Sequence, residues 1–516
     1  MNDQAEIKGP SDIKGPSDIK GPSDIKGLSE RAARGVAWIV GARVIMRVLG
    51  FVNTIVLARI LAPEDFGLIA VALTAMQLLQ GLSDIGVSQA VIRFRDAARA
   101  DLDTLFTLSA IRGAATAVLL FAAAPLAASF YGDPRMFWVF AGVAAFPLII
   151  GLSNPAFFEF ERNFDFSREF VSMAATKLVG VAVSIVIAVA YGTYWAIILG
   201  LLASGVVQLV LSYVMRPFLP RLTFQSLRKV LDFSGWLAGV SFMAALNNKL
   251  DAFVLARAVG AHGTGNYYVG HQLAELPTAE IASPIARAIY PGLSALQADP
   301  ARMRLAYLKG VEALGAVAMP AALGFAFVAR DVISLLLGDK WLAAAPVIEV
   351  LTPVMGLQTL FIATQYYAMA LGLTRLVFFR ELIFFLIRFP AFVWGAFAFG
   401  LPGAIYAAAG CGLIHAGFNL VLYARASGRP FWEPLWSARR SLASVAAMAA
   451  YFVFVKPSLA PLEGLPAAAA LGADILVGAG VYLAAHAALW RAEGRPDGAE
   501  KTALAGARRM LERFRP

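Results

Sequence analysis

The amino-acid sequence predicts an all-α polytopic membrane protein of about 14 transmembrane helices, arranged as two repeated six-helix bundles plus two C-terminal helices. Three observations lead to this prediction. The 516 residues are 59% hydrophobic and only 15% charged, whereas soluble domains carry about 25% charged residues. Apolar stretches of about 20 residues, long enough to span a bilayer as a helix, recur along the chain. Several short sequence elements also occur twice, in the same order.

The clearest repeated element is Val56-Leu57-Ala58-Arg59, which returns as Val254-Leu255-Ala256-Arg257. In both copies a glycine follows eight residues after the arginine, at Gly67 and Gly265. Two shorter pairs keep the same order: Gly132-Asp133 with Gly338-Asp339, and Ala196-Ile197 with Ala404-Ile405. Internally repeated membrane bundles are a common architecture of secondary transporters, which hold the substrate between the repeats. The repeat therefore favours a transporter.

The chain begins with a repetitive tail, residues 1–30. The hexapeptide Ile7–Asp12 is repeated at Ile13–Asp18 and Ile19–Asp24, and a degenerate copy occupies Ile25–Glu30. Gly-Pro in the first three copies and the shortage of large apolar residues predict disorder. No apolar run follows the first basic residues, so a signal peptide is not expected.

The predicted helices follow in three groups. The first bundle, 31–215, has candidate spans at 36–58, 66–92, 104–129, 136–158, 169–190 and 193–215. A basic cytoplasmic linker, 216–232, leads to the second bundle, 233–425, with candidate spans at 233–256, 265–289, 304–328, 342–371, 376–399 and 402–423. Residues 426–490 hold two additional helices, 441–456 and 468–490. The basic tail, 491–516, ends in a stretch that fits either an amphipathic helix on anionic lipid or a frayed end.

The distribution of Lys and Arg predicts the orientation. The two tails and the even-numbered connections hold 30 of the 44 basic residues, and eight lie inside spans. The odd-numbered connections hold six: Arg59, Arg135, Arg257, Arg330, Lys340 and Lys456. The positive-inside rule then places both termini in the cytoplasm. Arg59 and Arg257 fall on the sparsely charged far side, where we expect them to act as gating or structural anchors.

Several function classes lack their sequence signatures. The sequence has no GxxxxGK[ST], HExxH or GxSxG motif, a single cysteine, Cys411, and four scattered histidines. We therefore expect no enzyme activity and no metal site. Asp96, Asp101 and Asp103 alternate with arginine and alanine, a pattern that predicts solvated turns. The basic residues gather at span ends, which argues against a nucleic-acid partner.

Charged residues inside predicted spans are the candidate functional residues. A charge near the bilayer centre costs about 2.5–3.5 kcal/mol on insertion scales, so one that persists usually faces a bundle interior. The cations suit an anionic headgroup such as phosphate, pyrophosphate or an acidic sugar. They are Arg43, Arg47, Arg112, Lys177, Lys249, Arg287 and Arg388. For each, snorkelling to the interface or a structural ion pair is the alternative. Lys309 and Glu312 are predicted to form such a pair.

Buried carboxylates are candidates for coupling or gating, because desolvation lets a carboxyl group carry a proton through a conformational cycle. Asp251 lies in the predicted seventh span, and Glu275 follows His271 by four residues in the eighth. Asp84, Glu349, Glu381 and Asp474 are further intramembrane carboxylates. No cofactor is expected, and the sequence leaves coupling to H⁺ or Na⁺ open.

The run from Leu57 to Gly67 resembles the first-loop signature of Wzx-like polysaccharide flippases, members of the multidrug/oligosaccharidyl-lipid/polysaccharide exporter superfamily. Further likenesses follow in order over residues 28–425: Asp84-Ile85-Gly86, Glu161–Phe166, Asp251–Tyr267, Pro277, Ser283-Pro284-Ile285, Pro291–Ser294 and Gly338-Asp339-Lys340-Trp341. The resemblance implies two six-helix bundles around a central cavity.

The resemblance also implies a function. Members of the family move undecaprenyl-diphosphate-linked oligosaccharide repeat units across the bacterial inner membrane by alternating access, for lipopolysaccharide or exopolysaccharide biosynthesis. Implied partners are membrane lipids, a polysaccharide polymerase and a chain-length regulator. One alternative is a cation-coupled multidrug exporter of the same superfamily, which should carry net negative charge in its cavity. The other is a membrane-embedded glycosyltransferase or ligase, which needs a large far-side loop.

Overall fold

A computed structural model of the chain describes residues 46–82, 99–162, 166–227, 246–247, 250–458, 466–495 and 501. Every regular element in these ranges is a helix, which confirms the all-α class. The predicted N-terminal tail and the C-terminal residues 502–516 lie outside the described ranges, as do Arg43, Asp84 and Lys249. Arg287 lies in a described helix, but its side chain is outside the description.

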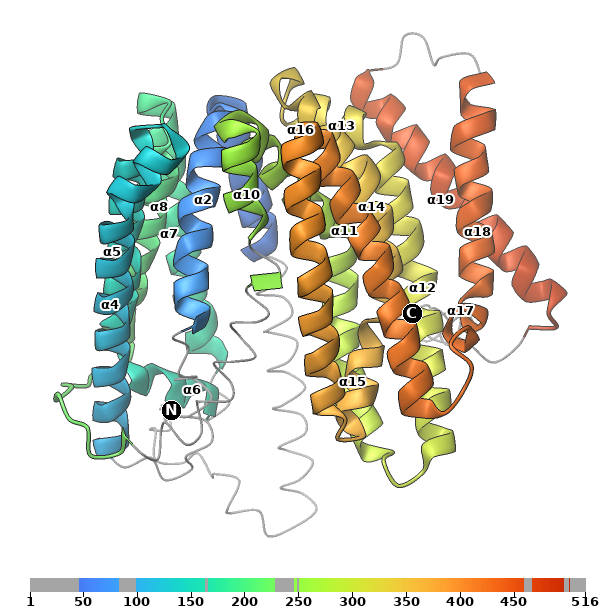
Figure 1. The fold of residues 1–516 in the computed structure, drawn as a ribbon, viewed down its shortest axis with the longest axis horizontal. Helices are drawn as coiled ribbons and strands as arrows, with labels where there is room; N and C mark the ends of the chain where they lie inside the picture. The colour runs from blue at the N-terminus through green and yellow to red at the C-terminus, as the bar shows by residue number, and fades with distance from the viewer. Residues whose placement is uncertain are drawn as a thin grey trace, which may run out of the picture. The chain divides into compact units, whose positions relative to one another are not determined.

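The helices follow the chain in the order shown in Figure 1. Residues 46–60 are helical. Next come α2 (Pro63–Leu82), α4 (Arg99–Tyr131), α5 (Arg135–Gly151), η3 (Pro155–Phe158), α6 (Glu159–Arg162), α7 (Phe166–Tyr191) and α8 (Trp195–Met215). The later helices are α10 (Asp251–Ala258), α11 (Gly260–Ala295), α12 (Pro300–Phe327), α13 (Ala329–Leu336), η4 (Asp339–Ala344), α14 (Ala345–Leu360), α15 (Ile362–Ala370) and α16 (Thr374–Ser427). The last elements of the described ranges are α17 (Glu433–Ser437), α18 (Arg439–Ala450), η5 (Tyr451–Val455), η6 (Lys456–Ser458) and α19 (Ala467–Ala492).

The membrane character of the chain is plain in these helices. Within the described residues, seven helical stretches are long and apolar enough to cross a membrane. One of them, α16, is 54 residues long and is interrupted at Gly400, whose φ of 64° is in the left-handed region that glycine tolerates. Its two parts correspond to the predicted spans 376–399 and 402–423. The chain is thus a multi-pass membrane protein, and the total of 14 spans stays a prediction.

The chain forms two compact units. Unit 1 comprises Met1–Leu57, Leu79–Ala128 and Met136–Ser241, and unit 2 comprises Ala58–Leu78, Ser129–Arg135 and Phe242–Pro516. Unit 2 therefore contains two short segments from the first half of the sequence, including the end of the first repeated element. The domain boundaries predicted from the sequence stay predictions.

Small residues let the helices of unit 1 approach closely, as is common between membrane helices. A methyl group at Gly113 of α4 would lie 2.4 Å from the Pro147 carbonyl oxygen of α5. Between α7 and α8, a methyl group at Gly200 would lie 1.8 Å from Ser184 Oγ. Glycine at these positions is therefore required for the observed packing.

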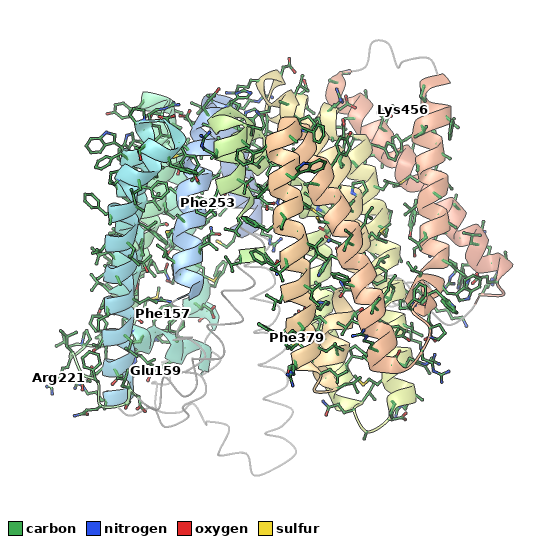
Figure 2. The ribbon with its side chains drawn as sticks, viewed as in Figure 1. Phe157, Glu159, Arg221, Phe253, Phe379 and Lys456 are labelled. Atoms are coloured by element: carbon green, nitrogen blue, oxygen red, sulfur yellow. The ribbon has the colours of Figure 1, made fainter. Side chains whose placement is uncertain are left out.

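The predicted basic linker is tied to the start of α4 within unit 1. Asp103 accepts a hydrogen bond from the Arg221 backbone N–H at 2.9 Å, and Thr107 Oγ1 accepts one from Thr223 N–H at 3.0 Å. Asp101 and Asp103 are only 3% and 4% exposed. The prediction that they lie in solvated turns was wrong, because the linker donates to both carboxylates, from Ser226 Oγ to Asp101 and from Arg221 N–H to Asp103. Figure 2 shows Arg221 and Glu159 at the same end of unit 1.

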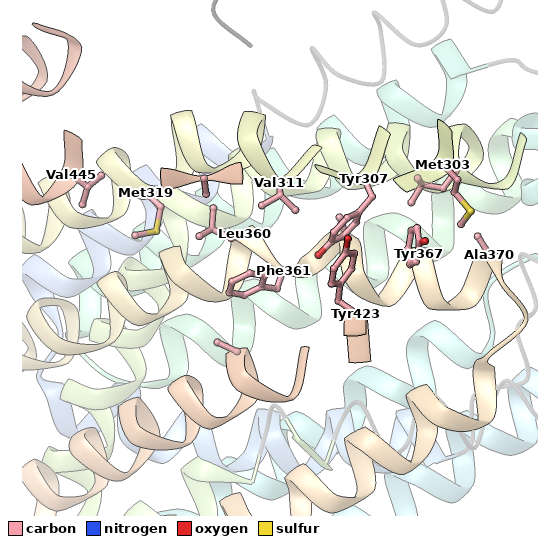
Figure 3. Close-up of a cluster of buried hydrophobic side chains, with 14 of the residues drawn as sticks. Met303, Tyr307, Val311, Met319, Leu360, Phe361, Tyr367, Ala370, Tyr423 and Val445 are labelled. Atoms are coloured by element: carbon pink, nitrogen blue, oxygen red, sulfur yellow. The ribbon is translucent and has the colours of Figure 1, made fainter. Parts of the chain in front are cut away.

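The core of unit 2 contains a cluster of buried tyrosines, shown in Figure 3. The rings of Tyr307 and Tyr423 stack with centroids 4.9 Å apart, and the Tyr307 hydroxyl lies 2.8 Å from Thr364 Oγ1. This cluster joins α12, α15 and α16. Helices α18 and α19 pair with each other and also pack against α12, where the Tyr482 hydroxyl donates to the Ala316 carbonyl at 2.8 Å.

An ion pair also joins α18 to α12. Glu312 is paired with Arg440, which is 6% exposed. The predicted pair of Glu312 with Lys309 is therefore wrong: Lys309 is exposed and Glu312 has a partner from a distant helix. Figure 2 labels Lys456 near one end of unit 2 and Phe379 toward the other.

Candidate functional site

The two copies of the repeated element meet inside unit 2. A methyl group at Gly67 would lie 1.9 Å from the Ala261 carbonyl oxygen, and one at Gly265 would lie 1.7 Å from the Pro63 carbonyl oxygen. Real Cβ atoms almost never approach another heavy atom closer than 3.0 Å. The backbones of α2 and α11 thus touch at a point where both residues must be glycine.

Equivalent positions of the two copies of the repeated element form this contact. Glu64 and His262 are 198 residues apart, the offset that separates Gly67 from Gly265, and His262 Nδ1 lies 2.7 Å from Glu64 Oε1. Burial alone would raise the pKa of Glu64, but its backbone hydrogen bond and His262 outweigh burial and hold that pKa below its usual value. Equivalent residues of the two repeats thus face each other across this contact.

Hydrogen bonds join Arg59 and Leu61, at the end of the first copy, to residues 335–340 before α14. Arg59 Nε donates to the Leu336 carbonyl at 2.7 Å, and its Nη2 donates to the Leu335 carbonyl. These carbonyls belong to the last turn of α13, where a cation is favourable. Lys340 Nζ donates in return to the carbonyls of Arg59 and Leu61, at 3.0 and 2.7 Å.

Trp341 completes this fastening. Its side chain is fully buried, its indole N–H donates to the Ala58 carbonyl at 2.8 Å, and its ring packs edge-on against Phe66 at 5.1 Å. The segment 338–341, singled out by its resemblance to a flippase signature, therefore holds the end of the first repeated element. We call residues 58–67, 261–265 and 335–341 together the repeat interface.

The second copy has a counterpart to this fastening. Arg257 lies over the Phe130 ring, 5.7 Å from its centroid, and the Tyr131 hydroxyl lies 3.5 Å from the Phe253 carbonyl oxygen. Phe130 precedes Gly132 by two residues, as Leu336 precedes Gly338 by two residues. Each arginine of the repeated element therefore contacts the equivalent segment of the other repeat.

A buried ion pair lies deeper in unit 2. Arg388 Nη2 donates to both carboxylate oxygens of Asp251, at 2.8 and 2.7 Å, and the Tyr267 hydroxyl donates to Asp251 at 3.0 Å. The side chains of Arg388 and Asp251 are only 13% and 10% exposed. One predicted headgroup ligand and one predicted coupling residue thus neutralise each other in this conformation.

The remaining predicted residues lie apart from this pair. In unit 1, Arg47 is exposed on the helix of residues 46–60, and Lys177 Nζ lies close to Gly50 of the same helix. Arg112 is half-buried in α4. In unit 2, Glu275 is exposed, with one oxygen 3.6 Å from His271 Nδ1. Their functional roles stay predictions.

Sequence inspection missed a polar cluster in unit 2. Arg380, which was not among the predicted candidates, is 8% exposed inside α16. It donates to Asn419 at 2.5 Å, to Gln365 at 3.0 Å and to Glu381, and Glu381 also accepts from Asn247 at 3.2 Å. His415 lies beside Glu381. The available signal was the position of Arg380-Glu381 inside the predicted span 376–399. We call Asn247, Gln365, Arg380, Glu381, His415 and Asn419 the polar cluster.

Comparisons with known proteins agree on one family. Residues 56–346 match the family described as "Polysaccharide biosynthesis protein", a match that begins at the first repeated element. The chain is 28% identical over 328 residues to the lipopolysaccharide biosynthesis protein WzxC of Escherichia coli, which covers 63% of this chain and 67% of WzxC. It is 24% identical over 426 residues to the succinoglycan biosynthesis transport protein ExoT of Rhizobium meliloti, covering 82% and 86% of the two chains.

Two solved structures show the same fold. The lipid II flippase MurJ in an inward closed conformation superposes with a TM-score of 0.69 at 14% identity, covering 89% of this chain and all of MurJ. An inward-facing multidrug transporter of the MATE family superposes with a TM-score of 0.58 at 16% identity, covering 77% and 95% of the two chains.

Proposed function

Because the chain belongs to the polysaccharide biosynthesis protein family, we propose that it moves lipid-linked oligosaccharide repeat units across the bacterial inner membrane by alternating access. The substrate class follows from relatives whose names place them in lipopolysaccharide and succinoglycan biosynthesis. An undecaprenyl-diphosphate carrier is the proposed lipid, and the proposed partners are a polymerase and a chain-length regulator. The proposal includes no enzymatic step.

The repeat interface is the observation that carries this proposal. An alternating-access carrier needs a contact between its repeats that closes one side of the substrate path and later opens. In unit 2 the two copies of the repeated element form such a contact, with glycine against backbone at Gly67 and Gly265. The contacts of Arg59 and of the Glu64–His262 pair are polar and exposed, so water can replace them when the helices separate. We place this closure on the far side of the membrane, with both termini in the cytoplasm.

The cations of unit 1 are the proposed headgroup contacts. Arg47 lies on the helix of residues 46–60, Lys177 Nζ lies close to Gly50 of that helix, and Arg112 is half-buried in α4. A diphosphate carries closely spaced negative charges, which guanidinium and ammonium groups bind through charge-assisted hydrogen bonds. Arg388 is already paired with Asp251, so it is available to substrate only in a conformation that separates this pair.

A deletion strain of the source bacterium tests the proposal. Loss of the gene should abolish one surface polysaccharide and leave lipid-linked repeat units in the cytoplasmic leaflet. Normal polysaccharide together with altered drug tolerance would contradict the flippase and support the second candidate, a cation-coupled multidrug exporter. The MATE-like fold is compatible with that candidate. The neutralisation of Asp251 by Arg388 argues against it, since a cationic drug needs uncompensated negative charge.

A further inference from the structure

We propose that the polar cluster of unit 2 is a proton-binding site, with His415 as the group that takes up the proton and Glu381 as its counter-charge. This proposal rests on the proposed transport function, for which it supplies a coupling ion. Six polar side chains gather here among helices that cross the membrane, where unsatisfied polar groups are costly. Three buried atoms of the cluster have no hydrogen-bond partner among the described residues: Asn247 Oδ1, Arg380 Nε and His415 Nε2.

His415 stands where a protonated imidazole would be stabilised from two sides. Its Nε2 lies 3.8 Å from Glu381 Oε1, too far for a hydrogen bond but close enough for an ion pair. Its ring lies 4.4 Å from the ring of Phe384, whose π face attracts a cation. A proton from water on Nε2 would thus turn a poorly satisfied contact into a charge-assisted hydrogen bond.

The same geometry disfavours a metal cation. Both oxygens of Glu381, the carboxylate of the cluster, already accept hydrogen bonds, Oε1 from the Arg380 guanidinium and Oε2 from Asn247. Among the described residues, no group of three or more His, Cys, Asp and Glu side chains could hold a metal ion. A proton needs only one free lone pair, which His415 Nε2 offers.

Other charged and titratable groups on the packed helices stand near the cluster. On α16, Arg388 lies two turns beyond Glu381, and Cys411 lies one turn before His415. Arg388 is paired with Asp251 of α10, to which Tyr267 of α11 donates. Asp251 and Arg388 neutralise each other, so neither of them needs to take up the proton. His415 is then the group of this region that gains a positive charge.

One chain segment links the cluster to the repeat interface. Asn247 donates to Glu381 and precedes Asp251 by four residues, and α10 then carries the second copy of the repeated element. A protonated His415 attracts Glu381 through Oε1, whereas Asn247 donates to Oε2, so closing the His415 contact draws the carboxylate away from Asn247. Uptake of a proton therefore loosens the anchor of this segment and favours separation of the repeat interface.

Cross-linking tests this inference without any sugar substrate. The full-length chain carries Glu64→Cys and His262→Cys in a Cys411→Ser background, is reconstituted in proteoliposomes, and is treated with a short bis-maleimide at about pH 8.0 and pH 5.5. The matched control is His486→Gln, because His486 is a buried histidine near Tyr482 and Ser444, outside the cluster. Ratios to this control cancel the pH dependence of the thiol chemistry itself.

The cross-linking rate of His415→Gln, divided by that of the His486→Gln control, should be about one at pH 8.0 and about five or more at pH 5.5, the lower range of ordinary coupling between sites. Glu381→Gln should raise this ratio less at pH 5.5, with both variants first shown to be monodisperse. A His415→Gln ratio that is the same at both pH values overturns the proton site. Either outcome leaves the flippase proposal standing, because that proposal is tested by lipid-linked repeat units in cells.

Discussion

Replacing Gly67 or Gly265 with alanine should open the repeat interface. At Gly265 the new methyl group would lie 1.7 Å from the Pro63 carbonyl oxygen, whereas ordinary contact begins at 3.4 Å. The deficit of about 1.7 Å falls on backbone atoms, so the helices must move apart. Overpacking of this kind costs about 1–3 kcal/mol. The ratio of closed to open molecules should therefore drop about 5- to 150-fold, at 1.4 kcal/mol for each factor of ten.

The cross-linking pair at positions 64 and 262 measures this ratio directly. Gly417→Ala is the matched control, because Gly417 lies in α16 and a methyl group there meets nothing within 4 Å. Gly67→Ala and Gly265→Ala should each cross-link far more slowly than Gly417→Ala at the same pH. If all three variants cross-link at the same rate, close backbone contact does not hold the interface shut and the reasoning fails.

Three further predictions concern single side chains. Trp341→Phe removes the indole N–H that donates to the Ala58 carbonyl, a net loss of about 1 kcal/mol. The closed-to-open ratio should therefore fall about fivefold in the same cross-linking assay. An unchanged ratio would show that this hydrogen bond does not hold the repeat interface closed. Asp251→Asn leaves the buried Arg388 guanidinium without its counter-charge and should lower the free energy of unfolding by about 3–5 kcal/mol, measured by chemical denaturation in detergent. Adding Arg388→Gln should restore part of this loss. A free energy of unfolding equal to that of the parent would rule out a stabilising pair. Arg47→Ala should reduce polysaccharide export about 10- to 150-fold, with Arg47→Lys retaining part of it, since a hydrogen bond to a charged group contributes about 1.5–3 kcal/mol. Full export by both variants would remove Arg47 from the headgroup site.

The sequence predicted the helical class and the repeat because both depend on local pattern. Long apolar stretches must become helices in a membrane, and the recurrence of Val-Leu-Ala-Arg at an offset of 198 residues needs only inspection. The meeting of the two copies depends instead on the folded path of the chain. Nothing near Gly67 in the sequence specifies that its neighbour is Ala261.

Charged side chains show the same limit. Asp251 and Arg388 were each recognised as costly in a membrane, but a separation of 137 residues conceals their pairing. Arg380 was missed because it stands near the start of a span, where a long side chain usually reaches water. It is buried because Asn419, Gln365 and Glu381 take up its donors from inside the bundle. Sequence identifies which charges need partners, while packing decides which partners they find.

The repeat interface is symmetric in position but not in chemistry. Arg59 donates to two carbonyls at the end of α13, whereas Arg257 in the equivalent place contacts only the face of the Phe130 ring among the interactions described for it. Hydrogen bonds from a cation to helix-terminal carbonyls depend strongly on direction, whereas a cation over a ring tolerates sliding. The first copy is therefore fixed and the second can shift. The second copy lies on α10, which begins at Asp251, four residues after Asn247 of the polar cluster. The copy that can shift is therefore the one connected to the polar cluster.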